Sequence, residues 1–177
     1  ILGRILGAPE EDGDWLTEKG DALIGNTDSD FTTHVVDQVD TEEYRLMPFR
    51  SPAAVELFDY AEKQAKLKRN SDSQDVMSML LRPLKSGEYL TDLEFKNFLT
   101  LVVAAGSDTT RYSIAASLHA IANHPSLLEQ LQRTEDASWE TVTNELIRWA
   151  SPTMHFRRTA TQDIELHGKQ IKAGDKV

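Results

Sequence analysis

Cysteine is absent from the 177 residues of the chain. This absence excludes disulfides, zinc-thiolate sites and cysteine nucleophiles within these residues. The sequence also lacks an excess of positive charge, because its formal net charge is −10 at pH 7. Such a chain is a poor partner for nucleic acid or an anionic membrane surface, so we expect neither. Long apolar runs are missing as well, so we expect no membrane span and no secretion signal.

The composition is that of a globular protein. Hydrophobic residues make up 40% of the sequence, and the length suffices for one domain with a sizeable core. The chain opens at Ile1 inside an apolar pattern and closes at Val177 where a new strand is expected, so we predict a fragment of a longer domain. The five histidines show no metal-ligand spacing, and we expect most of them at the surface or at helix ends.

Residues 1–152 carry the signals of helices, and residues 153–177 those of a small β region. One amphipathic helix is expected over residues 10–25. Further helix starts are predicted from caps or prolines at Ser51-Pro52, Thr91–Glu94 and Pro125, and another helix is expected to start near Ser138. His167-Gly168 predicts a two-residue hairpin turn, because glycine supplies the positive φ that such turns need. We therefore predict a mainly α fold with a small β region, of the α+β class, within a single domain.

The long central helix, expected from Thr91 to Asn123, has an unusual middle. From Phe95 to Ala105 nearly every residue is apolar, which is typical of a helix buried on all faces. Five small or polar residues follow, and the glycine among them alone costs about 1 kcal/mol relative to alanine in a helix. Two interpretations stay open. Gly106 could end one helix before a second begins, or a single helix could pass over a cofactor that approaches the bare backbone of Gly106.

The stretch from Ala105 to Thr110 resembles the oxygen-activation signature in the central helix of cytochromes P-450. The resemblance implies two catalytic residues. Thr109 would hydrogen-bond bound dioxygen and ordered water, and Asp108 would relay protons from solvent. It also implies that Ala105, Gly106 and Thr109 lie against the haem.

Two later motifs resemble the same family in the same order. Glu145 and Arg148 share one helix face; alone they would indicate a surface ion pair, whereas the resemblance gives them a structural role. The stretch from His155 to Val177 resembles a strand region in which an arginine binds a haem propionate, and the matching residue is Arg158. By family position, the substrate pocket is expected to include Val102, Val103, Thr153, Met154 and His155.

The resemblance, strongest over residues 91–177, implies a partial cytochrome P-450 fold with haem b as cofactor. The axial cysteine is expected beyond Val177, so we expect no metal ligand in these residues and no activity of the fragment itself. The intact enzyme would be a bacterial, cytoplasmic monooxygenase that inserts one oxygen atom from O2 into a small apolar substrate. Electrons would come from NAD(P)H through a ferredoxin and a reductase. The sequence around His155 is similar to that of enzymes that hydroxylate steroid side chains, terpenoids or alkanes.

Two alternatives remain at this point. The chain could be a helical binding or interaction domain without a cofactor, with a helix break at Gly106 and a surface ion pair at Glu145. It could also belong to a protein of the same haem fold with altered chemistry, such as a peroxygenase or an inactive relative. A cysteine-containing haem loop further along the chain would distinguish the monooxygenase from both.

Overall fold

The computed structural model describes residues 1–36, 38–153, 156 and 158–177. It divides into two compact units, Ile1–Arg111 and Tyr112–Val177, and the division falls inside one long helix. The described residues are mostly helical and contain a two-stranded antiparallel sheet, so the predicted α+β class is confirmed. Among them, no helix is both long and apolar enough to cross a bilayer.

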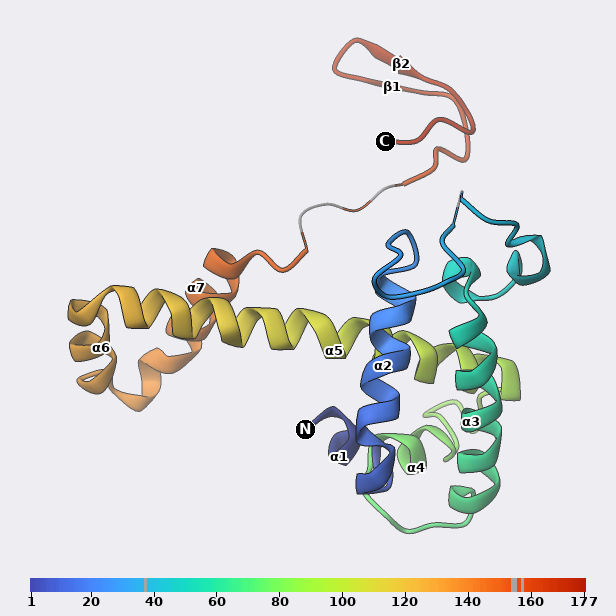
Figure 1. Cartoon of the computed structure of the whole chain (residues 1–177), viewed down its shortest axis with the longest axis horizontal. Coiled ribbons are helices and arrows are strands. Elements are labelled where there is room, and N and C mark those ends of the chain that lie inside the picture. Colours follow the sequence, from blue (N-terminus) through green and yellow to red (C-terminus); the bar gives the residue numbers. More distant parts are fainter. Residues whose placement is uncertain (37, 154–155, 157) are drawn as a thin grey trace. The chain divides into compact units, whose positions relative to one another are not determined.

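Helices dominate the first unit (Figure 1). Its α-helices are α1 (Leu2–Leu6), α2 (Gly13–Ile24), α3 (Pro52–Lys68), α4 (Val76–Leu80) and the first part of α5 (Asp92–Asn123). Short 3-10 helices lie at Glu10–Asp12, Glu42–Tyr44 and Pro48–Arg50. The helix expected over residues 10–25 thus begins as a 3-10 turn and becomes α-helical at Gly13. α2 and α3 lie side by side and contact each other.

Local hydrogen bonds fix where the helices of this unit begin. At the start of α3, Ser51 Oγ accepts a hydrogen bond from Ala53 N at 3.2 Å. At the start of α5, Glu94 N donates to Thr91 Oγ1 at 3.2 Å, while Thr91 N donates to the Glu94 carboxylate at 2.8 Å. The two caps predicted at these positions are confirmed, and the second is a reciprocal capping box.

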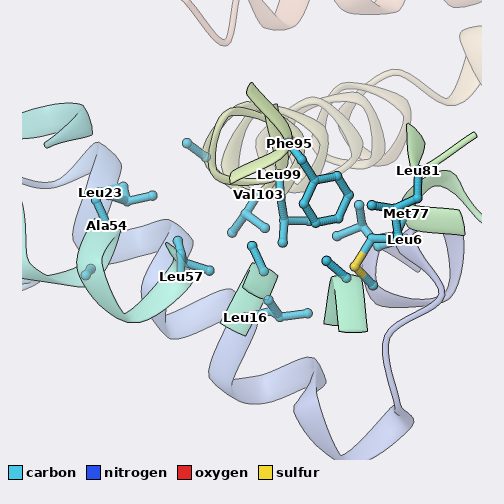
Figure 2. Packing of buried hydrophobic residues seen from close by; sticks show 14 residues of the cluster. Leu6, Leu16, Leu23, Ala54, Leu57, Met77, Leu81, Phe95, Leu99 and Val103 are labelled. Atoms are coloured by element: carbon cyan, nitrogen blue, oxygen red, sulfur yellow. The ribbon is translucent and has the colours of Figure 1, made fainter. Parts of the chain in front are cut away.

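Figure 2 shows the core of the first unit. α5 contributes Phe95, Leu99 and Val103, which lie four residues apart and therefore share one helix face. Leu16 of α2 and Leu57 of α3 belong to the same buried cluster. Its other members are Leu6, Leu23, Ala53, Ala54, Ala61, Ala65, Met77, Leu81 and Ala104. Burial of this face fixes the rotation of α5, and hence which of its residues stay accessible.

The second unit holds the end of α5, two further helices and a hairpin. α6 spans Pro125–Gln132, a 3-10 turn spans Asp136–Ser138 and α7 spans Trp139–Ala150. β1 (Ile164–Leu166) pairs antiparallel with β2 (Lys169–Ile171). His167 and Gly168 between the strands have φ angles of 47° and 75°. Two consecutive positive φ angles define a type I′ turn, so the predicted hairpin is confirmed.

Candidate active site

α5 runs without a break through the segment Gly106–Thr110. The interpretation in which Gly106 ends one helix before a second begins is therefore wrong. Tertiary packing explains this outcome, because Val103 and Ser107 lie against Gly20 of α2. Packing between helices readily outweighs a propensity cost of about 1 kcal/mol at one glycine.

Thr109 and Ala105 lie one turn apart on the same face of α5. The Thr109 hydroxyl donates a hydrogen bond to the Ala105 carbonyl oxygen at 2.5 Å. Ala105 and Leu101 are exposed, whereas Val103 between them points into the core. The accessible face of α5 therefore carries the methyl group of Ala105 and the aliphatic side chain of Leu101 beside the hydroxyl of Thr109. Such a surface fits a flat, largely apolar group such as a haem.

Gly106 has a packing partner within the first unit. A Cβ atom added to Gly106 would lie 3.2 Å from Leu2 Cδ1 of α1, closer than side chains normally approach. The missing side chain therefore makes room for Leu2. Contact of Gly106 with a haem stays a prediction, as do the contacts predicted for Ala105 and Thr109.

Asp108 belongs to a cluster of three charged side chains. Arg111 Nη2 donates to Asp108 Oδ1 at 3.0 Å, one turn along α5. The same guanidinium donates to Asp21 of α2, from Nη2 at 2.9 Å and from Nη1 at 3.3 Å. Hydrogen bonds donated to Asp21 first, and to Asp108 second, raise the pKa of Arg111 above its ordinary value. Asp108, the carboxylate expected to relay protons, is thus paired with Arg111, which also binds Asp21 of α2.

Sequence reasoning missed this cluster. The spacing of Asp108 and Arg111, three residues apart on one helix, is a signal that could have indicated their pairing. No comparable signal exists for Asp21, because it lies 90 positions before Arg111 in the sequence.

The residues predicted to line the substrate pocket differ in accessibility. Val103 is fully buried in the core and Val102 is partly buried. Thr153 is exposed. Met154 and His155 lie outside the described residues. Val103 thus has a packing role, and contact with substrate stays a prediction for all five residues.

Glu145 and Arg148 form a bidentate ion pair on α7. Arg148 Nε and Nη2 each lie 2.7 Å from a carboxylate oxygen of Glu145. The hydrogen bonds from Arg148 lower the pKa of Glu145 below its ordinary value. Glu145 borders an apolar hollow of about 630 Å³ on the end of α5, α6 and α7. The structural role assigned to the pair stays a prediction.

Arg158 is placed by backbone pairing with Val177. Its N–H donates to the Val177 carbonyl oxygen at 2.7 Å, and its own carbonyl oxygen accepts from Val177 N at 2.9 Å. Its guanidinium carbon lies 5.5 Å from the centre of the Phe156 ring. An arginine fork offers parallel donors to a carboxylate. The side chain therefore has the chemistry to bind a haem propionate, and that role stays a prediction.

Known proteins resemble the chain in sequence. The profile of the family described as cytochrome P-450 matches residues 53–137. A steroid C26-monooxygenase of Mycobacterium tuberculosis is 34% identical over 176 residues, which cover 99% of this chain and 37% of that protein. A methyl-branched lipid omega-hydroxylase of the same species is 31% identical over 177 residues, covering 100% of this chain and 39% of that protein. The chain thus spans less than two fifths of the length of these relatives.

Solved structures resemble the chain in fold. A Mycobacterium marinum cytochrome P-450 in complex with pseudoionone matches with a TM-score of 0.75 and 31% identity, over 99% of this chain and 40% of that one. A Bacillus megaterium enzyme of the same family in complex with testosterone matches with a TM-score of 0.72 and 26% identity, over 99% of this chain and 43% of that one. Profile, relatives and structures agree: the chain resembles cytochromes P-450 in sequence and in fold.

Proposed function

We propose that a full-length protein containing these residues is a haem-dependent monooxygenase. Haem b is the cofactor of the family, and with a thiolate ligand it would activate O2, one atom of which enters the substrate. The observation that supports the proposal most is the continuous helix α5, which carries Asp108 and Thr109 beside an accessible face at Ala105.

Asp108 and Thr109 would control the protons of the reaction. The Thr109 hydroxyl is both a donor and an acceptor, so it can orient a water molecule or dioxygen. Asp108 has a side chain that is 44% exposed. It can therefore take a proton from solvent at a carboxylate oxygen and pass it towards Thr109. Controlled proton delivery in a site closed to bulk water limits the loss of reduced oxygen as peroxide.

Residues of the second unit would support the cofactor. Arg158 would bind a haem propionate through its guanidinium, and the Glu145–Arg148 pair would brace α7. The sequence contains no cysteine. The thiolate ligand must therefore come from outside these residues, and we propose that the 177 residues alone do not turn over.

The proposed substrate is an apolar molecule such as a steroid side chain or a branched lipid. Two relatives support this class, because their names describe oxidation of a steroid at C26 and omega-hydroxylation of methyl-branched lipids. Terpenoids and alkanes present similar carbon–hydrogen bonds and belong to the same class. Electrons would come from NAD(P)H through a ferredoxin and its reductase. A cytoplasmic location stays a prediction.

Two measurements on the full-length protein test the proposal. The reduced protein should bind carbon monoxide with the shifted Soret band of thiolate-bound haem. Thr109→Ala should divert NAD(P)H into hydrogen peroxide and lower the product formed per NAD(P)H by about tenfold or more, because proton delivery contributes at least this much.

Thr143→Ala is a matched control for Thr109→Ala. Thr143 also donates its hydroxyl hydrogen to the carbonyl oxygen four residues before it, at 2.8 Å, but on α7. This variant should keep the normal ratio of product to NAD(P)H. A protein without the Soret shift would overturn the monooxygenase proposal, and an unchanged ratio in Thr109→Ala would overturn the role of Thr109.

A further inference from the structure

Asp21 and Asp108 share one nitrogen of Arg111, because Nη2 carries two hydrogens and donates one to each carboxylate. Nη2 lies 2.9 Å from Asp21 Oδ1 and 3.0 Å from Asp108 Oδ1. Asp21 has a second bond, because Nη1 lies 3.3 Å from its Oδ2. Two bonds from one guanidinium fork hold a carboxylate more firmly than one. Asp21 is therefore the stronger of the two acceptors.

Exposure of the carboxylates points in the same direction. The side chain of Asp21 is 23% exposed, whereas that of Asp108 is 44% exposed. Water screens the attraction between charges more strongly where a side chain is more exposed. Asp108 is thus the acid that can leave Arg111 at lower cost, while Arg111 stays anchored on α2.

The backbone around the cluster holds α2 close to α5. A Cβ atom added to Gly20 would lie 3.3 Å from the carbonyl oxygen of Val103 and 3.4 Å from Ser107 Cβ. The absence of a side chain at Gly20 lets α2 approach α5 immediately beside Asp21. Close packing at this point keeps the carboxylate of Asp21 within reach of Arg111.

Few other charges bear on Asp108 in the described residues of the first unit. On α5 its ion-pair partner is Arg111, and on α2 the carboxylate that meets this arginine is Asp21. The neighbouring cation on α2, Lys19, pairs instead with Glu18 and Glu56. The electrostatic environment of Asp108 is therefore set chiefly by Arg111 and by Asp21, the second anion that Arg111 binds.

We propose that Arg111 is a positioning residue that holds Asp108 between proton transfers, and that Asp21 weakens this hold because its negative charge offsets part of the positive charge of Arg111. The inference rests on the proposed function of Asp108 as a proton relay. To pass a proton, Asp108 accepts it from solvent at a carboxylate oxygen, separates from Arg111 and releases it to a water molecule at Thr109. Arg111 stays protonated and paired with Asp21 throughout, so the cluster returns to its starting charge when the proton leaves.

Kinetics of the full-length holoenzyme test the effect of sharing Arg111 between the two carboxylates. Asp21→Asn leaves Arg111 wholly to Asp108, so proton delivery slows and the fraction of NAD(P)H lost as hydrogen peroxide should rise roughly twofold to fivefold, the range of a surface ion pair. In an Arg111→Met background, Asp21→Asn should have no effect, because there is no cation left to share. Glu18→Gln removes a charge from the same helix without touching the cluster, and should leave the peroxide fraction unchanged.

Unfolding of the same full-length protein gives a readout that needs no turnover. The coupling between Asp108 and Arg111 is obtained from the unfolding constants of Asp108→Asn, Arg111→Met and the double variant. This coupling, expressed as a factor in the unfolding constant, should be roughly twofold larger in an Asp21→Asn background than with Asp21 present. Equal coupling in both backgrounds, or additive effects of Asp21→Asn and Arg111→Met on peroxide, would overturn the inference. Thr109→Ala and the carbon monoxide spectrum report on the monooxygenase proposal independently of these results.

Discussion

The two units of the chain differ in how much apolar surface they bury. In Ile1–Arg111, 14 buried hydrophobic residues form one cluster. In the described part of Tyr112–Val177, the buried hydrophobic residues are Ala120 and Ala150. The first unit therefore has a core of its own, whereas the second presents helices with accessible apolar faces.

Several large apolar side chains on the helices of the second unit are exposed rather than packed against other residues. Leu118 on α5 is 62% exposed and Trp149 on α7 is 61% exposed. Helices as short as α6 and α7 are marginal in water unless tertiary packing stabilises them. The first unit is therefore stabilised by contacts within itself. The second needs contacts beyond those made within its described residues.

Truncation of one leucine in each unit gives the largest contrast. Leu57→Ala removes a fully buried side chain of α3, and should lower the free energy of unfolding by about 2–5 kcal/mol through lost burial and a cavity. Leu118→Ala removes an exposed side chain of the same type, and should change the free energy of unfolding by less than about 0.5 kcal/mol. Urea unfolding of the 177-residue chain measures both. Equal losses would contradict the difference between the units.

Local signals in the sequence predict much of the fold. The capping box at Thr91 marks the start of α5, and Pro125 marks the start of α6, because caps and prolines act within one helical turn. The hairpin turn at Gly168 follows from the same kind of local chemistry. The candidate residues Asp108 and Thr109 also come from a short motif, so they can be predicted without knowing what packs against α5.

Contacts between distant segments cannot be predicted in this way. Asp21 meets Arg111 only because α2 packs on α5, and the approach of Leu2 to Gly106 depends equally on the position of α1. The continuity of α5 has the same origin. Local propensity at Gly106 permits one helix or two, and packing of neighbouring helices decides between them.

Ion pairs give a second contrast between the units. The Asp75 carboxylate is 8% exposed and accepts hydrogen bonds from Lys68 Nζ at 3.1 Å and from Ser78 N and Oγ, both at 2.9 Å. Burial alone would raise the pKa of Asp75, but hydrogen bonds from Ser73, Ser78 and Lys68 outweigh it and hold the pKa well below its ordinary value. Glu145 in the second unit pairs with Arg148 at the surface, where water screens the charges.

Asp75→Asn should therefore lower the free energy of unfolding by about 1–3 kcal/mol at neutral pH, because a buried donor loses its acceptor. A depressed pKa in the folded state adds stability above the unfolded pKa, about 3.9 for aspartate, which is lost as pH falls through the folded pKa. The difference between wild type and Asp75→Asn should thus shrink below about pH 4. Urea unfolding at several pH values measures it. Glu145→Gln should leave the unfolding of the 177-residue chain unchanged, and an equal effect at both sites would break the contrast.

Helix caps give the smallest contrast. Thr91→Ala removes a hydroxyl that accepts from Glu94 N at 3.2 Å in the first unit, and should lower the free energy of unfolding by about 1 kcal/mol. Ser138 is the N-cap of α7 in the second unit but makes no side-chain capping bond. Ser138→Ala should therefore leave the unfolding midpoint in urea where it is. A loss at Ser138 as large as that at Thr91 would mean that α7 is capped in solution, and that the second unit contributes to the cooperative unfolding of the chain.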